Sequence, residues 1–149
     1  MTTSLARHHF VADIFTTALE GGIGYWSQCT DYHWCNDDGT DDLMGFYADI
    51  VVPVEDLSEA ERAHGTPSTY TTWNGTEAEA YGFRIDRSVM LRGLRLAATT
   101  PVIDGETHHW QCGDGRPPLV ITDDVEWDYD ACDADAIVQY GLFGKVIFG

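Results

Sequence analysis

Apolar residues near the start of the chain recur with the period of an α-helix. Between Ser4 and Glu20, each residue advances by about 100° around a helix axis, and the apolar side chains then fall on one broad arc. Gly21-Gly22 follows, where a helix C-terminus favours glycine. The pattern predicts an amphipathic helix over Ser4–Glu20, with an apolar arc made of Leu5, Phe10, Val11, Ala12, Ile14, Phe15, Ala18 and Leu19.

Alternating apolar and polar positions predict strands in much of the remaining chain. In Phe46–Val54, for example, Ala48, Ile50 and Val52 fall on one face at period two. Asn74-Gly75 and Asp104-Gly105 are typical of two-residue hairpin turns. The segments that we predict as strands are Ile23–Cys35, Phe46–Val54, Tyr70–Trp73, Thr76–Ile85, Val102–Ile103, Glu106–Trp110, Leu119–Ile121 and Val146–Phe148.

Capping residues mark further helices. Asp86 is placed to cap a helix that runs to about Ala98, and Asp133 to cap one that runs to about Leu142 and stops at Gly144. Leu57–His64 fits a short helix. We therefore predict a single α+β domain over residues 1–149, with about three helices around a mostly antiparallel sheet with hairpins.

Charge narrows the range of partners. The 149 residues include 25 acidic and 8 basic side chains, which gives a formal net charge of −17. Because 44% of the residues are apolar, we expect this charge to lie on a folded domain. A phosphate-binding surface needs clustered Lys and Arg, so we expect no direct contact with nucleic acid and none with a membrane. The chain lacks a secretory signal pattern, and we expect its four cysteines to be reduced in a cytoplasm.

An acidic run near the C-terminus is interleaved with aromatic residues. Spaced carboxylates can imitate DNA phosphates on a basic partner, and exposed aromatic residues are typical of interfaces. Solvation alone is the commoner role of such a run. The candidate acidic surface consists of Asp123, Asp124, Glu126, Trp127, Asp128, Tyr129, Asp130, Asp133 and Asp135.

Four of the seven arginines lie within twelve residues: Arg84, Arg87, Arg92 and Arg95. Intramolecular pairing is the favoured interpretation in so acidic a chain. The alternative is an anion pocket for a nucleotide-type small molecule, with Tyr25 and Trp26 as a stacking surface for a base.

Cysteines and histidines offer a possible zinc set, and with it the alternative of a zinc-containing protein or a metal-dependent enzyme. In an extended segment Cys29, His33 and Cys35 point to one face, as do His108 and Cys112 on the later hairpin. Neither segment has the C-x2-C spacing of structural zinc sites, so buried thiols and partly exposed histidines are favoured and we expect no cofactor. The acidic loop Asn36–Asp42 fails the EF-hand spacing, with Trp34 and Gly45 at positions that require acidic ligands.

The chain has none of the common nucleophile, metalloprotease or phosphate-loop motifs, and this makes an enzyme the weaker class. Three of its segments, Thr17–Trp26, Leu91–Leu94 and Asp133–Gly144, resemble a small acidic protein family of actinobacteria and their phages. The resemblance implies a phage or mobile-element accessory protein in a bacterial host cytoplasm.

The favoured hypothesis is therefore a non-catalytic accessory protein. It would bind and modulate or inhibit a basic host or phage protein through an acidic, aromatic-studded surface that resembles DNA in its charge.

Overall fold

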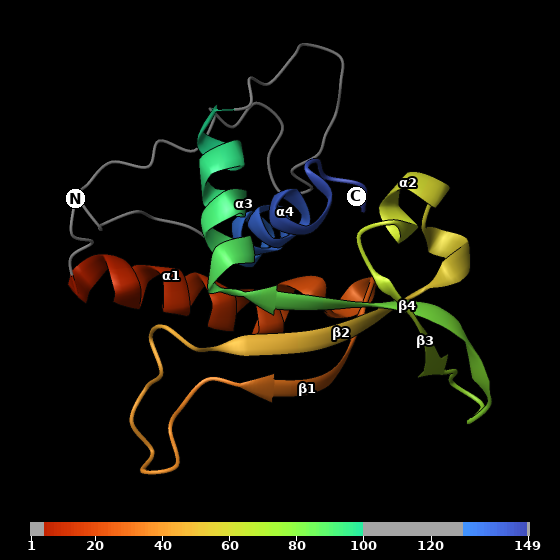
Figure 1. Cartoon of the computed structure of the whole chain (residues 1–149), viewed down its shortest axis with the longest axis horizontal. Helices are drawn as coiled ribbons and strands as arrows, with labels where there is room; N and C mark the ends of the chain where they lie inside the picture. Colours follow the sequence, from red (N-terminus) through yellow and green to blue (C-terminus); the bar gives the residue numbers. More distant parts are fainter. Residues whose placement is uncertain (1–4, 100–129, 149) are drawn as a thin grey trace.

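The computed structural model describes residues 5–99 and 130–148, and it confirms the α+β class (Figure 1). A π-helical turn, η1, directly continues α1, and a 3-10 turn, η2, follows it. The elements in chain order are α1 (Leu5–Thr17), η1 (Ala18–Gly22), η2 (Ile23–Tyr25), β1 (Gln28–His33), β2 (Tyr47–Pro53), η3 (Val54–Asp56), α2 (Glu59–Arg62), β3 (Thr66–Thr71), β4 (Glu77–Asp86), α3 (Arg87–Thr99) and α4 (Ala131–Phe143).

The four strands form one antiparallel sheet in the order β1-β2-β4-β3, so β1 and β3 are its edges. A turn that contains Asn74-Gly75 joins β3 to β4 as predicted, but it is not the two-residue turn expected. The Gly75 amide donates to the Thr72 carbonyl at 2.9 Å, so Trp73 and Asn74 are the central residues, and Gly75 follows with a φ of 85° that a side chain would disfavour. In Figure 1, α1 runs along the sheet at the level of β4 and β2, and α3 and α4 lie beyond β4. β1 forms the edge farthest from α3 and α4.

The core lies between the sheet and the helices. The alternating residues Ala48, Ile50 and Val52 of β2 are buried, as the period-two pattern predicted. The rings of Phe15 on α1 and Phe46 before β2 lie 4.4 Å apart. Other members of the cluster are Phe10, Val11, Ile14, Phe83, Ile85, Met90, Leu94, Ile137 and Val138.

Helix α4 is buried from Asp133 to Phe143, and its first turn corrects the predicted cap. Asp130, not Asp133, is the N-cap: its side chain accepts a hydrogen bond from the Asp133 amide at 3.0 Å. The Asp133 side chain in turn accepts from the Asp130 amide at 3.0 Å, which completes a capping box. Gly144 ends the helix with a φ of 75°, as predicted.

Three strand predictions differ from the structure. The strand before the Asn74-Gly75 turn spans Thr66–Thr71 rather than Tyr70–Trp73. Ile23–Tyr25 is a 3-10 turn, and the strand begins at Gln28. The segment 146–148 is not a strand, because the buried Gln139 side chain takes the place of a pairing strand. Its Oε1 accepts from the amides of Ile147 and Phe148, both at 2.8 Å, and its Nε2 donates to the Phe148 carbonyl at 3.2 Å. The predicted strands at 102–110 and 119–121 lie outside the described residues.

Within the described part of the chain, no helix is long and apolar enough to cross a membrane.

Candidate binding groove

A β-bulge in β1 decides which side chains of this edge strand face the helices. Cys29 lies opposite Ile50, and the register then shifts, so that Tyr32 lies opposite Ala48 and His33 opposite Tyr47. Opposed residues of an antiparallel pair point to the same face. Since Ile50 and Ala48 face the core, Cys29 and Tyr32 lie on the helix-bearing face and His33 lies on the other.

A groove with a volume of about 450 Å³ lies between α1 and β1. Its helical wall is formed by Phe15, Thr16 and Leu19, and its strand wall by Cys29, Tyr32 and Trp34, with Glu20 at the rim. The aromatic side chains remain open to solvent, since Tyr32 is 57% exposed and Trp34 is 45% exposed. Large aromatic surfaces that line an open groove are typical of binding sites.

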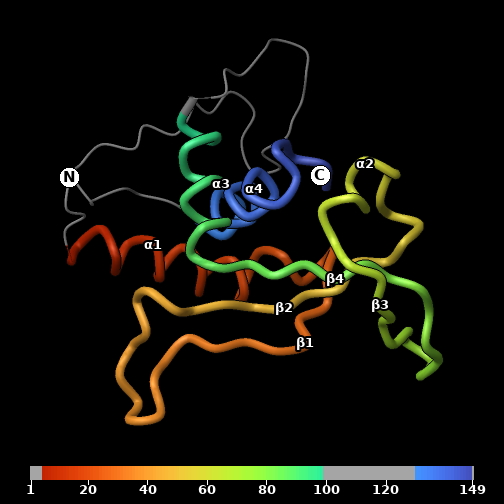
Figure 2. Tube along the Cα trace, viewed as in Figure 1, coloured from red at the N-terminus to blue at the C-terminus, as the bar shows by residue number. Residues whose placement is uncertain are grey.

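A smaller cavity of about 30 Å³ continues the groove toward the loop between β1 and β2, and shares Phe15, Thr16 and Trp34 with it. Three carboxylates line this end: Asp13 of α1 and Asp41 and Asp42 of the loop. The loop projects from the end of the sheet nearest the start of α1 (Figure 2). The groove is therefore apolar along its walls and acidic at this end.

Local hydrogen bonds fix the acidic loop. The Asp42 carboxylate accepts from the Gly45 amide at 2.7 Å and lies 3.0 Å from Nε2 of His33. These contacts, the Gly45 bond foremost, lower the pKa of Asp42. The Asp42 amide donates to the Trp34 carbonyl at 2.9 Å, which holds Trp34 beside the loop. The carboxylate at this position is thus ionised and its surroundings are ordered by the fold.

The groove begins at the π-helical turn. Leu19 and Glu20 both belong to η1, where the helix of α1 widens before it ends. The amide of Ile23 donates to the Ala18 carbonyl, the i to i+5 spacing of a π-helix. Single π-turns occur often at functional sites, and here the turn supplies one apolar and one acidic groove residue.

The predicted acidic surface lies only partly within the described residues. Asp123, Asp124, Glu126, Trp127, Asp128 and Tyr129 lie outside them. Asp130 is exposed and serves as the α4 cap, whereas Asp133 and Asp135 are buried. The prediction that these two aspartates belong to an exposed surface is wrong, because they occupy the buried side of a helix that is enclosed nearly all round.

Three of the four arginines of the predicted anion pocket contact different groups. Arg84 pairs with Asp49 through two contacts of 2.7 and 2.9 Å, and stacks on the Tyr47 ring at 4.1 Å. This pairing lowers the pKa of Asp49. Arg87 lies 3.0 Å from Nδ1 of His8, and Arg92 donates to the Gly141 carbonyl at 2.9 Å.

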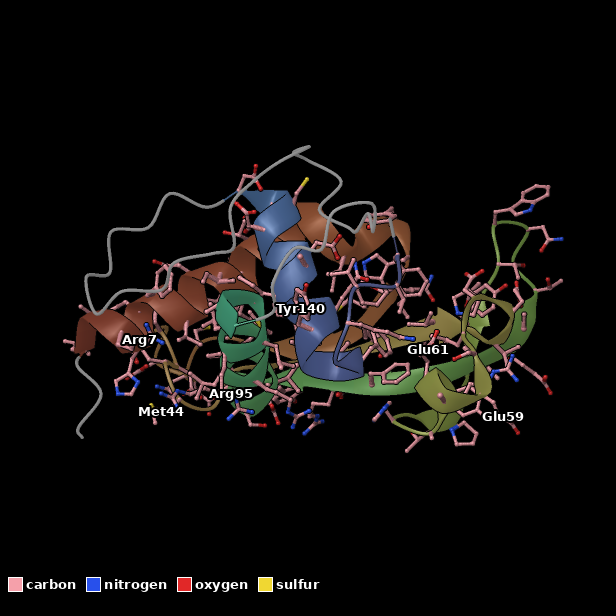
Figure 3. All side chains as sticks on the ribbon, turned by 90° about the horizontal axis from the view of Figure 1, so that it is seen from above. Arg7, Met44, Glu59, Glu61, Arg95 and Tyr140 are labelled. Carbon is pink, nitrogen blue, oxygen red and sulfur yellow. The ribbon has the colours of Figure 1, made fainter. Side chains whose placement is uncertain are left out.

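Figure 3 places Arg95 toward the end of the molecule that carries Arg7 and Met44. Arg84 lies on the sheet, and the other three arginines follow α3. Arg84 and Arg87 line one open pocket of about 310 Å³ together with Tyr47 and Asp86, and neither Arg92 nor Arg95 lines it. For Arg84, the structure shows the intramolecular pairing that the sequence favoured.

Tyr25 and Trp26 do not form an open stacking surface, because both bind Asp135. Trp26 is buried and donates from Nε1 to Asp135 Oδ1 at 2.7 Å, and Tyr25 donates to Oδ2 at 2.9 Å. Gln139 adds a third hydrogen bond to Oδ1 at 3.0 Å. The Trp26 ring stacks on Phe148 with centroids 4.8 Å apart. The proposed base-binding role for Trp26 is thus contradicted.

The candidate zinc set is divided by the bulge, which puts Cys29 and His33 on opposite faces of β1. Cys35 sits beyond β1 in a bridge with Asp41, and His108 and Cys112 lie outside the described residues. Residues 5–99 and 130–148 contain no group of three side chains suited to holding a metal ion. Burial raises the pKa of the Cys29 thiol, so this side chain acts in the groove as an apolar thiol. Cys132 is disulfide-bonded, which corrects the expectation of four reduced thiols.

Sequence reasoning missed the groove. Tyr32 and Trp34 were visible as aromatic residues two positions apart, a spacing that puts both on one face of an exposed strand. The sequence pattern could not show which residues form the opposite wall of the groove. Phe15 and Leu19 lie thirteen or more residues earlier in the chain, and only the fold brings them beside Tyr32 and Trp34.

Comparison with protein-family models, with curated proteins and with solved structures finds no match to this chain. The site must therefore be interpreted from its own geometry and charge.

Proposed function

We propose that this protein is a non-catalytic binding protein that holds a basic segment of a partner protein in the groove between α1 and β1. The observation that carries the proposal is that a groove with the exposed aromatic residues Tyr32 and Trp34 adjoins a small carboxylate-lined cavity, which shares Phe15, Thr16 and Trp34 with it. Aromatic side chains supply most of the binding energy at protein interfaces, and opposite charge steers the partner to the site.

The charge of the rest of the molecule supports the same partner. A net charge of −17 attracts cationic surfaces and repels nucleic acid, so selectivity for a basic protein follows from long-range electrostatics. The resemblance of three segments to an acidic family of actinobacteria and their phages supports a host or phage protein as the partner. Binding would then modulate or inhibit that protein in the bacterial host cytoplasm.

Site-specific photocrosslinking in a bacterial host tests the proposal. With Tyr32→p-benzoylphenylalanine, irradiation is expected to link the groove to a protein with a basic segment, identified by mass spectrometry. The same substitution at Trp73, a 98% exposed residue at the tip of the β3–β4 turn, is the matched control. Trp73 is more accessible than Tyr32 and lies on a different hairpin, so random collision would favour the control position.

Charge reversal separates specific capture from random collision. Asp13→Lys together with Asp41→Lys should reduce the adduct by about tenfold, because both carboxylates line the acidic end. Glu79→Lys, an exposed residue on β4, should leave it unchanged. Equal adducts from positions 32 and 73, or an adduct that survives reversal of both aspartates, would contradict the proposed function.

A further inference from the structure

The sheet carries helices over one face, and this layer is incomplete at β1. α1 contributes Phe10, Ile14 and Phe15 to the same core as the inward residues of β2. On β1, by contrast, the helix-facing residues Cys29 and Tyr32 are exposed. Figure 1 shows β1 as the outermost strand below β2, with α1 at the level of β4 and β2 and with α3 and α4 on the far side of β4. The uncovered part of this face is the strand wall of the groove.

We propose that the missing element is an amphipathic α-helix of the partner, basic on its polar side, which lies against β1 beside α1. This inference rests on the proposed function and specifies the form of the bound segment. The six residues of β1 extend for roughly 20 Å, and a helix of that length has about 13 residues. One apolar stripe of such a helix would cover Tyr32 and Trp34.

The edge of β1 disfavours an added strand, and a helix is the alternative regular form for the bound segment. Phe15 is 1% exposed and belongs to the core, so the groove side chains that remain partly accessible on this wall are Thr16 of α1 and Leu19 of η1. The edge of β1 is interrupted by the bulge between Cys29 and Asp31, and the Cys29 thiol donates to the Asp31 carbonyl at 3.5 Å. Bulges of this kind protect edge strands from pairing with another chain.

Charge complementarity indicates which molecule supplies the helix that lies in the groove. Residues 100–129 of this chain contain seven acidic residues and only Arg116 as a base, so they would add negative charge to an acidic rim. A second copy of the chain brings a further −17 and is repelled for the same reason. A basic helix of another protein is therefore the occupant that complements the rim.

The rim also predicts where the cations of that helix lie. Asp13 and Glu20 mark the two ends of the groove on the α1 side and are seven residues apart. Seven residues correspond to about 10 Å along a helix. Two Lys or Arg residues about seven positions apart, both on the α1 side of an apolar i, i+3, i+4 stripe, would meet the two carboxylates.

Three labelled 13-residue peptides test the inference by fluorescence anisotropy. The first carries a leucine stripe with two lysines seven positions apart and is locked as a helix by a hydrocarbon staple on its outer face. The second has the same charges and leucines but two central prolines that prevent a helix. The third is the stapled peptide with glutamates in place of the lysines. We expect the first to bind about tenfold more tightly than the second, and the third not to bind.

Variants locate the peptide. Tyr32→Ala and Asp13→Lys should each weaken the stapled peptide by about tenfold, whereas Trp73→Ala and Glu79→Lys should leave its affinity unchanged. All four residues are exposed, so the variants keep the fold, and thermal unfolding verifies this.

The outcomes separate this inference from the proposed function. If the proline peptide binds as tightly as the stapled one and still depends on Asp13, the bound segment is extended, and the helical inference is wrong while the proposed function stands. If no peptide binds although Tyr32 crosslinks a partner in cells, the helical inference alone is overturned. Binding that ignores Tyr32 and Asp13, or no binding together with no crosslink, overturns both.

Discussion

Asp135 shows how a single residue can organise distant segments. Its carboxylate accepts hydrogen bonds from Tyr25, Trp26 and Gln139, and Gln139 in turn holds the amides of Ile147 and Phe148. The described contacts provide hydrogen-bond donors around the carboxylate but no cation. Burial therefore raises the pKa of Asp135, and the three hydrogen bonds offset that rise only in part.

The raised pKa predicts a pH dependence. Because the folded chain holds the proton of Asp135 more tightly than the unfolded chain, the free energy of unfolding falls as pH rises from about 4 through the raised folded value. Asp135→Asn removes this dependence and keeps the network, since its oxygen accepts from Trp26 and Gln139 and its amide donates to the Tyr25 hydroxyl. Tyr25 can then donate to the Phe148 carbonyl, 3.2 Å away.

Urea unfolding across that pH range measures the effect as the difference between wild type and Asp135→Asn. The variant should gain stability relative to wild type as pH rises, and Asp37→Asn, in the exposed β1–β2 loop, controls for the loss of one charge. Stability curves for wild type and Asp135→Asn that stay parallel would contradict the assignment.

At the scale of elements, the closest packing is between α3 and α4. A Cβ on Gly93 of α3 would lie 1.9 Å from the Ile137 carbonyl oxygen, and one on Gly141 of α4 would lie 2.2 Å from the Val89 carbonyl oxygen. Both clashes are with backbone, which cannot rotate aside. The two helices approach this closely only because each presents a glycine to the other.

Gly93→Ala is expected to lower the free energy of unfolding by about 3 kcal/mol, although alanine is the better helix former, since the two backbones must separate. Gly24→Ala is the matched control, because nothing lies within 4 Å of a Cβ at that position. Chemical denaturation measures both. Equal stabilities for the two variants would show that α3 and α4 can move apart freely.

At the scale of the whole molecule, the dominant property is unbalanced charge. With 25 acidic and 8 basic residues, like charges repel one another more in the folded state than in the expanded chain. In Figure 3, Arg7 and Arg95 lie toward one end of the molecule and Glu59 and Glu61 toward the other, where Lys145 lies 4.0 Å from Glu61. Eight cations cannot pair one to one with 25 acids, so an excess of negative charge remains.

Salt should therefore stabilise the fold. We expect the urea midpoint to rise as NaCl increases from about 10 mM to about 300 mM, since the Debye length shortens from about 30 Å to under 10 Å. The double variant Asp37→Asn and Glu77→Gln, at two exposed positions, should show a smaller rise. A midpoint that falls or stays constant with salt would contradict self-repulsion. Binding of a basic partner should respond to salt in the opposite direction.

The sequence predicted local elements well where a residue type or a short pattern strongly favours one backbone conformation. Asn74-Gly75 marked the β3–β4 turn, Gly144 the end of α4, and Ala48, Ile50 and Val52 the inner face of β2. It failed where a distant side chain intervened. Val146–Phe148 has the composition of a strand, but the Gln139 side chain hydrogen-bonds to its backbone. Asp133 is a residue type that often caps helices, but Asp130 occupies the N-cap position of α4.

The sequence by itself therefore determined the α+β class, most element types and the excess of negative charge, because these follow from local periodicity, turn chemistry and composition. Only the tertiary structure decided which charged and aromatic residues are available to a partner. It buried Asp133, Asp135 and Trp26, paired Arg84 with Asp49, and turned Tyr32 toward α1 through a bulge that no residue pattern reveals. Exposure and neighbourhood depend on contacts between segments far apart in the chain, and local patterns do not encode them.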